Sequence, residues 1–168
     1  AEAELHAIPN PLINITLQGR HDTYPKRRGM TRVPELLAQG VNVAFGQDCC
    51  MDPWYSLGAA DMLEVANMAV HVGQMTSLDA MRQAYDAITV NSAKAMGIDD
   101  YGVAEGKSAN CVLLQARDPI EAIRLKATRL VVLRRGKIVS ETLPRIAKLG
   151  LDGRPGRIDA ADYAPVEG

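Results

Sequence analysis

The chain has 168 residues, of which 47% are hydrophobic, and its formal net charge is -1. This composition is enough for one substantial apolar core. Basic side chains are scattered and Phe and Trp occur once each, which argues against the cationic, aromatic face of a nucleic-acid binder. No apolar run approaches the ~20 residues of a membrane span, and the first residues lack an export-signal pattern. We therefore expect a soluble, cytoplasmic protein with neither a nucleic-acid nor a membrane partner.

The three cysteines make an odd count, and Cys49 and Cys50 are neighbours in the chain. A strained vicinal disulfide and two free thiols are both compatible with this pair, and free thiols are the more ordinary arrangement. There is no CxxC motif to indicate a zinc knuckle. This cysteine usage favours a reducing compartment.

The first expected elements form a strand, helix, strand unit. Residues 12–17 (LINITL) predict a strand, and residues 31–39 predict a short helix with an early proline and a glycine stop. Residues 41–45 (VNVAF), flanked by glycines, predict a buried strand. Because parallel strands joined by a helix end at the same edge of a sheet, we expect Gln18 and Asp48 to share that edge.

Polar and reactive side chains follow the second of these strands directly, in the order Gln47, Asp48 and Cys49. In parallel α/β sheets and barrels, ligands and catalytic groups sit at the carboxyl ends of the strands. Aspartate is also a common capping residue, so Asp48 has a purely structural alternative role at the next turn. The residue pattern alone leaves both roles open.

Helical spacing dominates the middle of the chain. We expect helices within residues 58–75, from Ser77 onward, and over residues 91–97. The first of these helices places one apolar set on a single face: Met62, Val65, Ala66, Ala69, Val72 and Gly73. Its methionines indicate core filling rather than a sulfur ligand site. The isolated histidines His21 and His71 are expected to be solvated or packed rather than metal ligands.

From Tyr101 onward the spacing changes to short β runs. Residues 111–114 predict a strand, and residues 130–142 predict a hairpin that turns at Arg135 and Gly136. A short helical or irregular link is expected between them. The end of the chain is rich in Gly, Pro, Asp and Ala, which predicts an extended or mobile tail.

Four long motifs resemble those of cytosine deaminase and its close relatives in the amidohydrolase superfamily. They are NPLINITLQGRHDTYPKRRGMTRV from Asn10, GVNVAFGQD from Gly40, MDPWYSLG from Met51 and YGVAEGKSANCVLL from Tyr101. The resemblance implies an α/β fold. Residues 1–99 would be the last βα units of a (β/α)8 barrel, residues 100–146 a returning β-sandwich segment, and residues 147–168 a tail. A complete barrel typically needs ~250 residues, so we expect the missing amino-terminal part of the barrel as a partner.

The resemblance also implies a reaction: hydrolytic deamination of cytosine or a related small cyclic amidine such as isocytosine, with one divalent metal ion, Zn or Fe, activating water. Asp48 matches the family aspartate that contacts the metal and shuttles the proton. Trp54 matches a tryptophan that lines the substrate pocket, and its alternative is a core or interface aromatic. Gln47 and Cys49 replace a His and a second Asp of the best-known pattern. We expect them to bind the substrate and to alter which ring is preferred.

The metal histidines and catalytic glutamate of the family have no counterpart in this sequence. No HxH pair is present, and His6, His21 and His71 share no ligand spacing. We therefore expect the remaining ligands outside this chain, and an isolated chain that is inactive and prone to form homo-oligomers through an open strand edge. Two alternatives stay open: a non-catalytic binding or assembly module of the same fold, and a thiol enzyme that uses Cys49 or Cys50.

Overall fold

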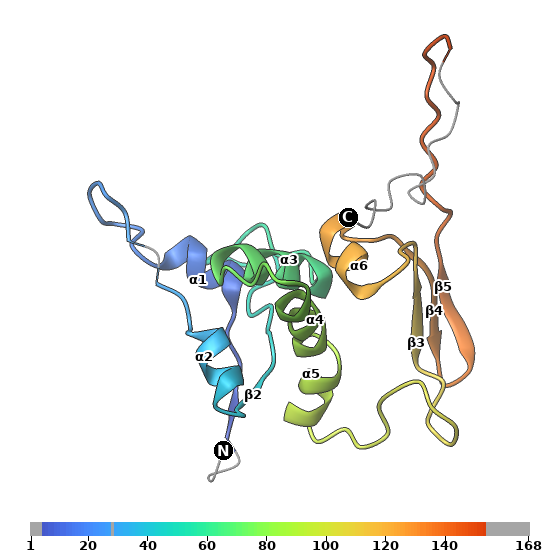
Figure 1. The fold of residues 1–168 in the computed structure, drawn as a ribbon, viewed down its shortest axis with the longest axis horizontal. Helices are drawn as coiled ribbons and strands as arrows, with labels where there is room; N and C mark the ends of the chain where they lie inside the picture. The colour runs from blue at the N-terminus through green and yellow to red at the C-terminus, as the bar shows by residue number, and fades with distance from the viewer. Residues whose placement is uncertain (1–4, 28, 154–168) are drawn as a thin grey trace, which may run out of the picture.

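The computed structural model describes residues 5–27 and 29–153 and shows a helical part beside a separate antiparallel sheet (Figure 1). In chain order the elements are β1 (His6–Ala7), α1 (Pro11–Leu17), α2 (Val33–Ala38), β2 (Asn42–Val43), α3 (Met62–Val72), α4 (Leu78–Ala87), α5 (Val90–Ala95), β3 (Cys111–Leu114), α6 (Pro119–Leu125), β4 (Arg129–Arg134) and β5 (Lys137–Glu141). The chain is therefore a mixed α/β structure, as the sequence predicted at this level.

The strands β1 and β2 form a short parallel pair. His6 faces Asn42 and Ala7 faces Val43 in this register. Two further backbone hydrogen bonds continue the pairing past the strand ends, from the amide of Ala44 to the carbonyl of Ala7 at 2.9 Å and from the amide of Gly46 to the carbonyl of Pro9 at 3.1 Å. The segments that follow β1 and β2 consequently leave the sheet side by side.

The predicted strand over residues 12–17 is wrong, because this segment is helix α1. Pro11 lies in the first turn of the helix, where the missing N–H removes no intrahelical hydrogen bond. Leu12 and Ile13 are buried together on the core side of the helix. The parallel partner of β2 is β1, so the argument that placed Gln18 beside Asp48 fails with the predicted strand.

The later helices follow their predicted signals more closely. In α3, the side chain of Asp61 caps the first turn by accepting hydrogen bonds from the amides of Leu63 and Glu64. In α4, the side chain of Ser77 accepts from the amide of Ala80 at 3.2 Å, which confirms the predicted helix start. Such caps satisfy amides that have no intrahelical partner.

A single apolar core joins α1, α3, α4, α6 and β2. Its most buried members include Leu12, Val43, Phe45, Val65, Ala66, Ala69, Ala84, Ala87, Ala122 and Ile123. The predicted inward face of α3 is confirmed for Val65, Ala66 and Ala69. Met75 is buried, and Met62 and Met68 pack against the same core, so these methionines fill space as predicted.

The antiparallel sheet has the strand order β3, β4, β5. The predicted strand over residues 111–114 is confirmed, and the hairpin turns at Arg135 and Gly136 with φ angles of 49° and 73°. Asn110 holds this turn, because its side-chain oxygen accepts a hydrogen bond from the amide of Arg135 at 2.9 Å. Beyond β5 the described part of the predicted tail contains no strand or helix up to residue 153, and the rest lies outside the described residues. No helix in the described ranges is both long and apolar enough to cross a bilayer.

Candidate active site at the carboxyl end of strand β2

The chain is fixed firmly where it leaves β2. Ala44 and Phe45 are buried, and the amide of Phe45 donates to the carbonyl of Ala87 at the end of α4. The amide of Gly46 is bound to Pro9, as described above. The residues from Gln47 onward therefore follow a segment that is buried and hydrogen-bonded at the sheet edge.

Asp48 is exposed at this edge and adopts a left-handed backbone conformation with a φ angle of 63°. Aspartate visits this region more readily than most residues other than glycine. Both of its carboxylate oxygens accept hydrogen bonds from this chain: Oδ2 from Nδ2 of Asn10 at 3.3 Å, and Oδ1 from the thiol of Cys49 at 3.5 Å. The carboxylate is thus oriented but still open to solvent.

Cys49 follows Asp48 directly in the chain and is buried, with 7% of its surface exposed. A hydrogen bond to Asp52, burial, and the neighbouring Asp48 together raise the pKa of the Cys49 thiol to about 12. A thiol in this environment stays protonated at neutral pH and acts as a donor, which argues against Cys49 as a nucleophile. Cys49, Cys50 and Cys111 are all free, so the prediction of free thiols is confirmed.

Asp52 organises the loop that follows, and the sequence interpretation missed it. Its Oδ1 accepts hydrogen bonds from the amides of Trp54 and Tyr55 at 2.9 and 3.0 Å. The thiol of Cys49 and the amides of Tyr55, Trp54 and Cys50 outweigh desolvation and hold the pKa of Asp52 below its ordinary value. An aspartate that bonds amides two and three residues ahead forms a local turn, and the Asp-Pro dipeptide was the available signal.

The loop buries Tyr55 and leaves Trp54 65% exposed. Trp54 is therefore not a core aromatic of this chain, and its indole remains free to contact a ring or a partner. The side-chain Nε2 of Gln47 donates to the carbonyl of Cys49 at 3.3 Å, whereas Oε1 of the same side chain is buried and finds no donor among the described residues. A buried acceptor without a partner is destabilising, so Gln47 is suited to accept from a group that lies outside these residues.

Two glycines allow the close contacts of this site. A Cβ on Gly58 would lie 2.0 Å from the carbonyl oxygen of Cys49, so the loop packs back on its own start. A Cβ on Gly46 would lie 2.2 Å from Oδ1 of Asn10. Asn10 is the second site residue that sequence interpretation missed, because its contact with Asp48 spans 38 positions.

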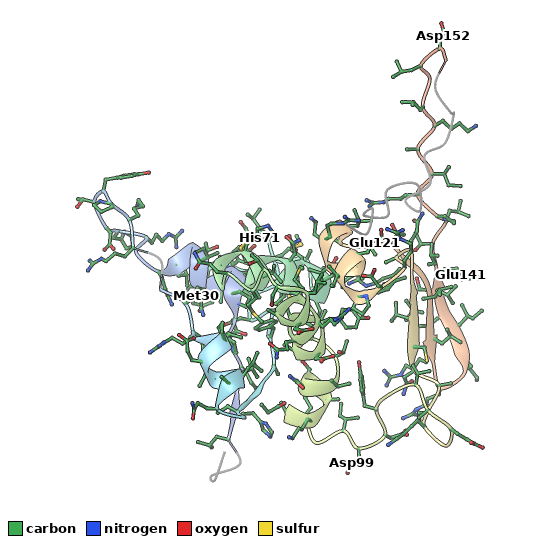
Figure 2. The ribbon with its side chains drawn as sticks, viewed as in Figure 1. Met30, His71, Asp99, Glu121, Glu141 and Asp152 are labelled. Atoms are coloured by element: carbon green, nitrogen blue, oxygen red, sulfur yellow. The ribbon has the colours of Figure 1, made fainter. Side chains whose placement is uncertain are left out.

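A divalent metal ion needs several His, Cys, Asp or Glu side chains placed around one point. Within residues 5–27 and 29–153, no group of three or more His, Cys, Asp or Glu side chains lies in a position to hold one. His71, labelled in Figure 2, has its Nδ1 2.7 Å from the carbonyl of Asn67 in its own helix, and Nδ1 of His6 lies 2.9 Å from Nδ2 of Asn42. Asp48 supplies one carboxylate, so the described residues by themselves do not fit a metal ion.

An exposed, oriented carboxylate lies at the carboxyl end of paired parallel strands, the position at which sites of α/β folds are found. The family model adds the particular assignment. Residues 1–143 match the model of the amidohydrolase family, and the chain therefore belongs to that family.

Individual relatives agree with this assignment. The chain is 34% identical over 151 residues to a pterin deaminase of Rhizobium rhizogenes, a match that covers 89% of this chain and 34% of the relative. It is 31% identical over 108 residues to the N-isopropylammelide isopropyl amidohydrolase of a Pseudomonas strain, covering 64% and 27% of the two chains. The chain thus spans about a third or less of the length of these relatives.

Among solved structures, the 5-methylcytosine deaminase from Klebsiella pneumoniae liganded with 5-fluorocytosine superposes with a TM-score of 0.80 and 41% sequence identity. That match covers 84% of this chain and 34% of the other. The predicted resemblance to cytosine deaminase and its close relatives in this superfamily is confirmed.

Proposed function

We propose that this chain is part of an amidohydrolase that hydrolytically removes an exocyclic amino group from a cytosine-type ring, and that Asp48 transfers the proton. The observation that carries the proposal is the exposed Asp48 carboxylate, held at both oxygens at the end of β2. Its support from relatives is the 41% identity to a 5-methylcytosine deaminase. In this proposal residues 1–99 supply the last units of a (β/α)8 barrel and residues 100–146 a β-sandwich segment.

The chemistry assigns one task to Asp48. An ionised carboxylate is an acceptor only, so it can take a proton from the water whose oxygen attacks the ring carbon that bears the amino group. The protonated Asp48 then gives that proton to the exocyclic nitrogen. The ring nitrogen next to this carbon takes up the second proton of the water, the carbon–nitrogen bond breaks, ammonia leaves, and a ring carbonyl remains. One water is thereby consumed for each amino group released.

The proposed cofactor is one divalent metal ion, Zn or Fe, which would supply an activated water when bound. Asp48 would be its ligand from this chain. The other ligands would come from residues outside the chain, since the described residues do not complete a metal site. The remaining barrel is the partner that this proposal requires.

Three further residues are proposed to contact or select the substrate. The indole face of Trp54 is suited to cover a flat heterocycle, and its exposure leaves it available for that role. Gln47 offers an unused acceptor oxygen beside the site. Cys49 places an uncharged thiol next to Asp48, at the position where the best-known pattern has a second aspartate. The thiol is smaller than a carboxylate, so it alters the space and polarity available to ring substituents.

The relatives suggest which rings to compare. One is named for deamination of 5-methylcytosine and another for deamination of pterin. Pterin contains the same 2-amino-4-oxo amidine unit as isocytosine, so both rings belong in one panel with cytosine and 5-methylcytosine.

The test measures ammonia release from these four rings by the complete protein that contains this chain. We expect turnover of at least one cytosine-type or isocytosine-type ring, and loss of that turnover in Asp48→Asn. Asp79→Asn, on the exposed surface of α4, is the matched control. If no ring in the panel releases ammonia, the proposed reaction is wrong, and if Asp48→Asn remains as active as the control, the assignment to Asp48 is wrong.

A non-catalytic binding module is the second candidate, favoured by the exposed apolar side chains in the loop that follows Asp48. Met51, Trp54 and Leu57 are 82%, 65% and 74% exposed. Such a module would bind a ring or a protein partner without consuming it. Calorimetric binding of 5-methylcytosine to the complete protein without ammonia release would favour this candidate over the enzyme.

A further inference from the structure

Asn10 occupies the N-cap position of α1 but makes no side-chain capping hydrogen bond. Asparagine at this position ordinarily accepts a hydrogen bond from an amide in the first turn of the helix. Here the side chain reaches away from its own helix, and Nδ2 donates to Oδ2 of Asp48 at 3.3 Å. The local stabilising role has been replaced by a contact with the proposed proton-transfer residue.

The space for this contact is made by Gly46. A Cβ there would lie 2.2 Å from Oδ1 of Asn10, a distance at which one of the two groups must move. The φ angle of Gly46 does not fall in the left-handed region that favours glycine, so backbone conformation does not explain the residue. The space that the Asn10 side chain needs explains why glycine occupies this position.

The other hydrogen-bond donor to the Asp48 carboxylate is weaker. The thiol of Cys49 meets Oδ1 of Asp48 at 3.5 Å, and a thiol is a weak donor. Asp48 is exposed, so packing against the described residues does not fix its rotamer. The amide of Asn10 is therefore the stronger of the two donors that orient the carboxylate.

We infer that Asn10 is a positioning residue for Asp48 and that Gly46 provides the space that lets Asn10 reach it. The inference rests on the proposed function, since Asp48 has its proton-transfer role only there. A carboxylate that samples other rotamers spends less time in the geometry that takes and returns the proton. Loss of the Asn10 contact should therefore lower kcat and leave KM nearly unchanged, because ring binding depends on other side chains.

The test uses the complete protein and four variants: Asn10→Ala, Asn10→Asp, Gly46→Ala and the double variant Asn10→Ala with Gly46→Ala. Misplacement of a reacting group by about 1 Å can cost ~10²-fold, so we expect each single variant to lower kcat by about 10- to 10²-fold. Asn10→Asp keeps the size of the side chain but replaces the donor with a second negative charge, so it should be at least as impaired as Asn10→Ala. Asn14→Ala, one turn further along α1, is the matched control and should retain normal kcat.

The double variant distinguishes positioning from a general structural role. With the Asn10 amide removed, a methyl group at position 46 meets no amide, so the second substitution should lower kcat by less than about twofold further. Residues that act through one contact show this non-additivity, whereas independent sites add. Fully additive losses, or a normal kcat in both Asn10→Ala and Asn10→Asp, would overturn the inference.

A crystal structure of the Asn10→Ala variant gives a readout that does not depend on activity. We expect the Asp48 carboxylate to leave its present rotamer or to occupy two, while the backbone of residues 44–49 stays in place. If the unmodified protein shows no turnover on the ring panel, the proposed function fails and this structure still decides the inference. An unchanged Asp48 rotamer would overturn it, and if Asn10→Ala does not fold, the same comparison is made with Gly46→Ala.

Discussion

The helical part and the antiparallel sheet differ in how they bury apolar side chains. In the helical part, Leu12 and Val65 are 2% and 0% exposed and belong to a continuous core. In the sheet, Val112 and Ile138 are 49% and 58% exposed, and β5 has no buried residue. Figure 1 shows the sheet standing beside the helices, with β5 on its outer side. The candidate site consequently rests on the part of the chain that has its own core.

Helix α6 and the start of β4 connect the sheet to the helical part. Ile123 of α6 is buried in the common core, and its carbonyl accepts a hydrogen bond from the side chain of Asn67 in α3 at 3.2 Å. At the start of β4, the guanidinium of Arg129 donates to both carboxylate oxygens of Asp61 at 2.6 and 3.2 Å. This ion pair joins the first turn of α3 to the sheet.

The largest expected difference between the two parts is in how much a substitution lowers catalytic activity, and Asp48 in the helical part should show it. Asp48→Asn keeps the shape of the side chain but removes the oxygen that accepts the proton, and general acid–base groups typically contribute ~10²–10⁴-fold. We expect kcat of the complete protein to fall by about that factor. Glu141→Gln, an equivalent change on exposed β5, should leave it unchanged. Equal losses in the two variants would show that activity does not depend specifically on the helical part.

The two parts should also differ in how much the truncation of an apolar side chain lowers the free energy of unfolding. Leu12→Ala leaves a cavity in the core, a change that typically lowers the free energy of unfolding by ~2–5 kcal/mol. Ile138→Ala removes a side chain that is 58% exposed, and surface substitutions usually stay within about 0.5 kcal/mol. Denaturant unfolding of the complete protein measures both. A large loss for Ile138→Ala would mean that a segment outside the described residues covers this face of the sheet.

Local signals predicted the elements whose reasons are local. Ser77 caps α4, and the Arg135–Gly136 turn sets the β4–β5 hairpin, because both depend on residues a few positions apart. The strand assigned to residues 12–17 failed because its isoleucines suggested a β run, whereas Pro11 and the burial of neighbouring Leu12 and Ile13 serve a helix. Tertiary packing decided between two patterns that are ambiguous in a short segment.

The candidate site follows the same rule: its local features could be predicted from the sequence, and its long-range contacts could not. Asp48 stood out as a candidate because it closely follows the apolar run of residues 41–45, and the family resemblance then decided between its catalytic and its structural role. The partner strand β1 has only two residues, which is too short to show a periodicity, and so the contact of Asn10 with Asp48 could not be foreseen. The burial of Cys49 also depends on how residues 49–58 fold back, which no spacing in the sequence reveals.

Thiol modification compares cysteines from the two parts. Cys50 is exposed in the helical part and Cys111 is partly exposed on β3, whereas Cys49 is buried and its pKa is raised to about 12. The thiolate is the reactive form, and its fraction falls about tenfold for each unit by which the pKa lies above the pH. At pH 8 we expect Cys50 and Cys111 to react at least ~10²-fold faster than Cys49, as followed by mass spectrometry of iodoacetamide-treated protein. Rapid labelling of Cys49 would revive its role as a nucleophile.

The Asp61–Arg129 pair predicts a smaller, pH-dependent effect on the connection between the two parts. Burial is the largest single influence and would raise the pKa of Asp61. The hydrogen bonds and charge of Arg129, with the amides of Leu63 and Glu64, together outweigh it, so the pKa of Asp61 lies below its ordinary value. A lowered carboxyl pKa contributes stability that is fully present above the unfolded-state value of ~3.9 and is lost as the pH falls through the folded-state value.

Asp61→Asn isolates this contribution, because the amide oxygen can still cap α3 while the charge is lost. The side chain of Arg129 is 39% exposed, so solvent screening limits the expected loss to about 1 kcal/mol in the free energy of unfolding at pH 7. The difference between the unmodified protein and Asp61→Asn should shrink as the pH falls below ~4, because Asp61 then becomes protonated in the unfolded chain before it does so in the folded protein. Asp79→Asn, which disrupts the exposed pair with Arg82, should change stability by less than about 0.5 kcal/mol. A loss in Asp61→Asn that stays the same from pH 7 to pH 3 would show that the cap, and not the ion pair to β4, is what Asp61 contributes.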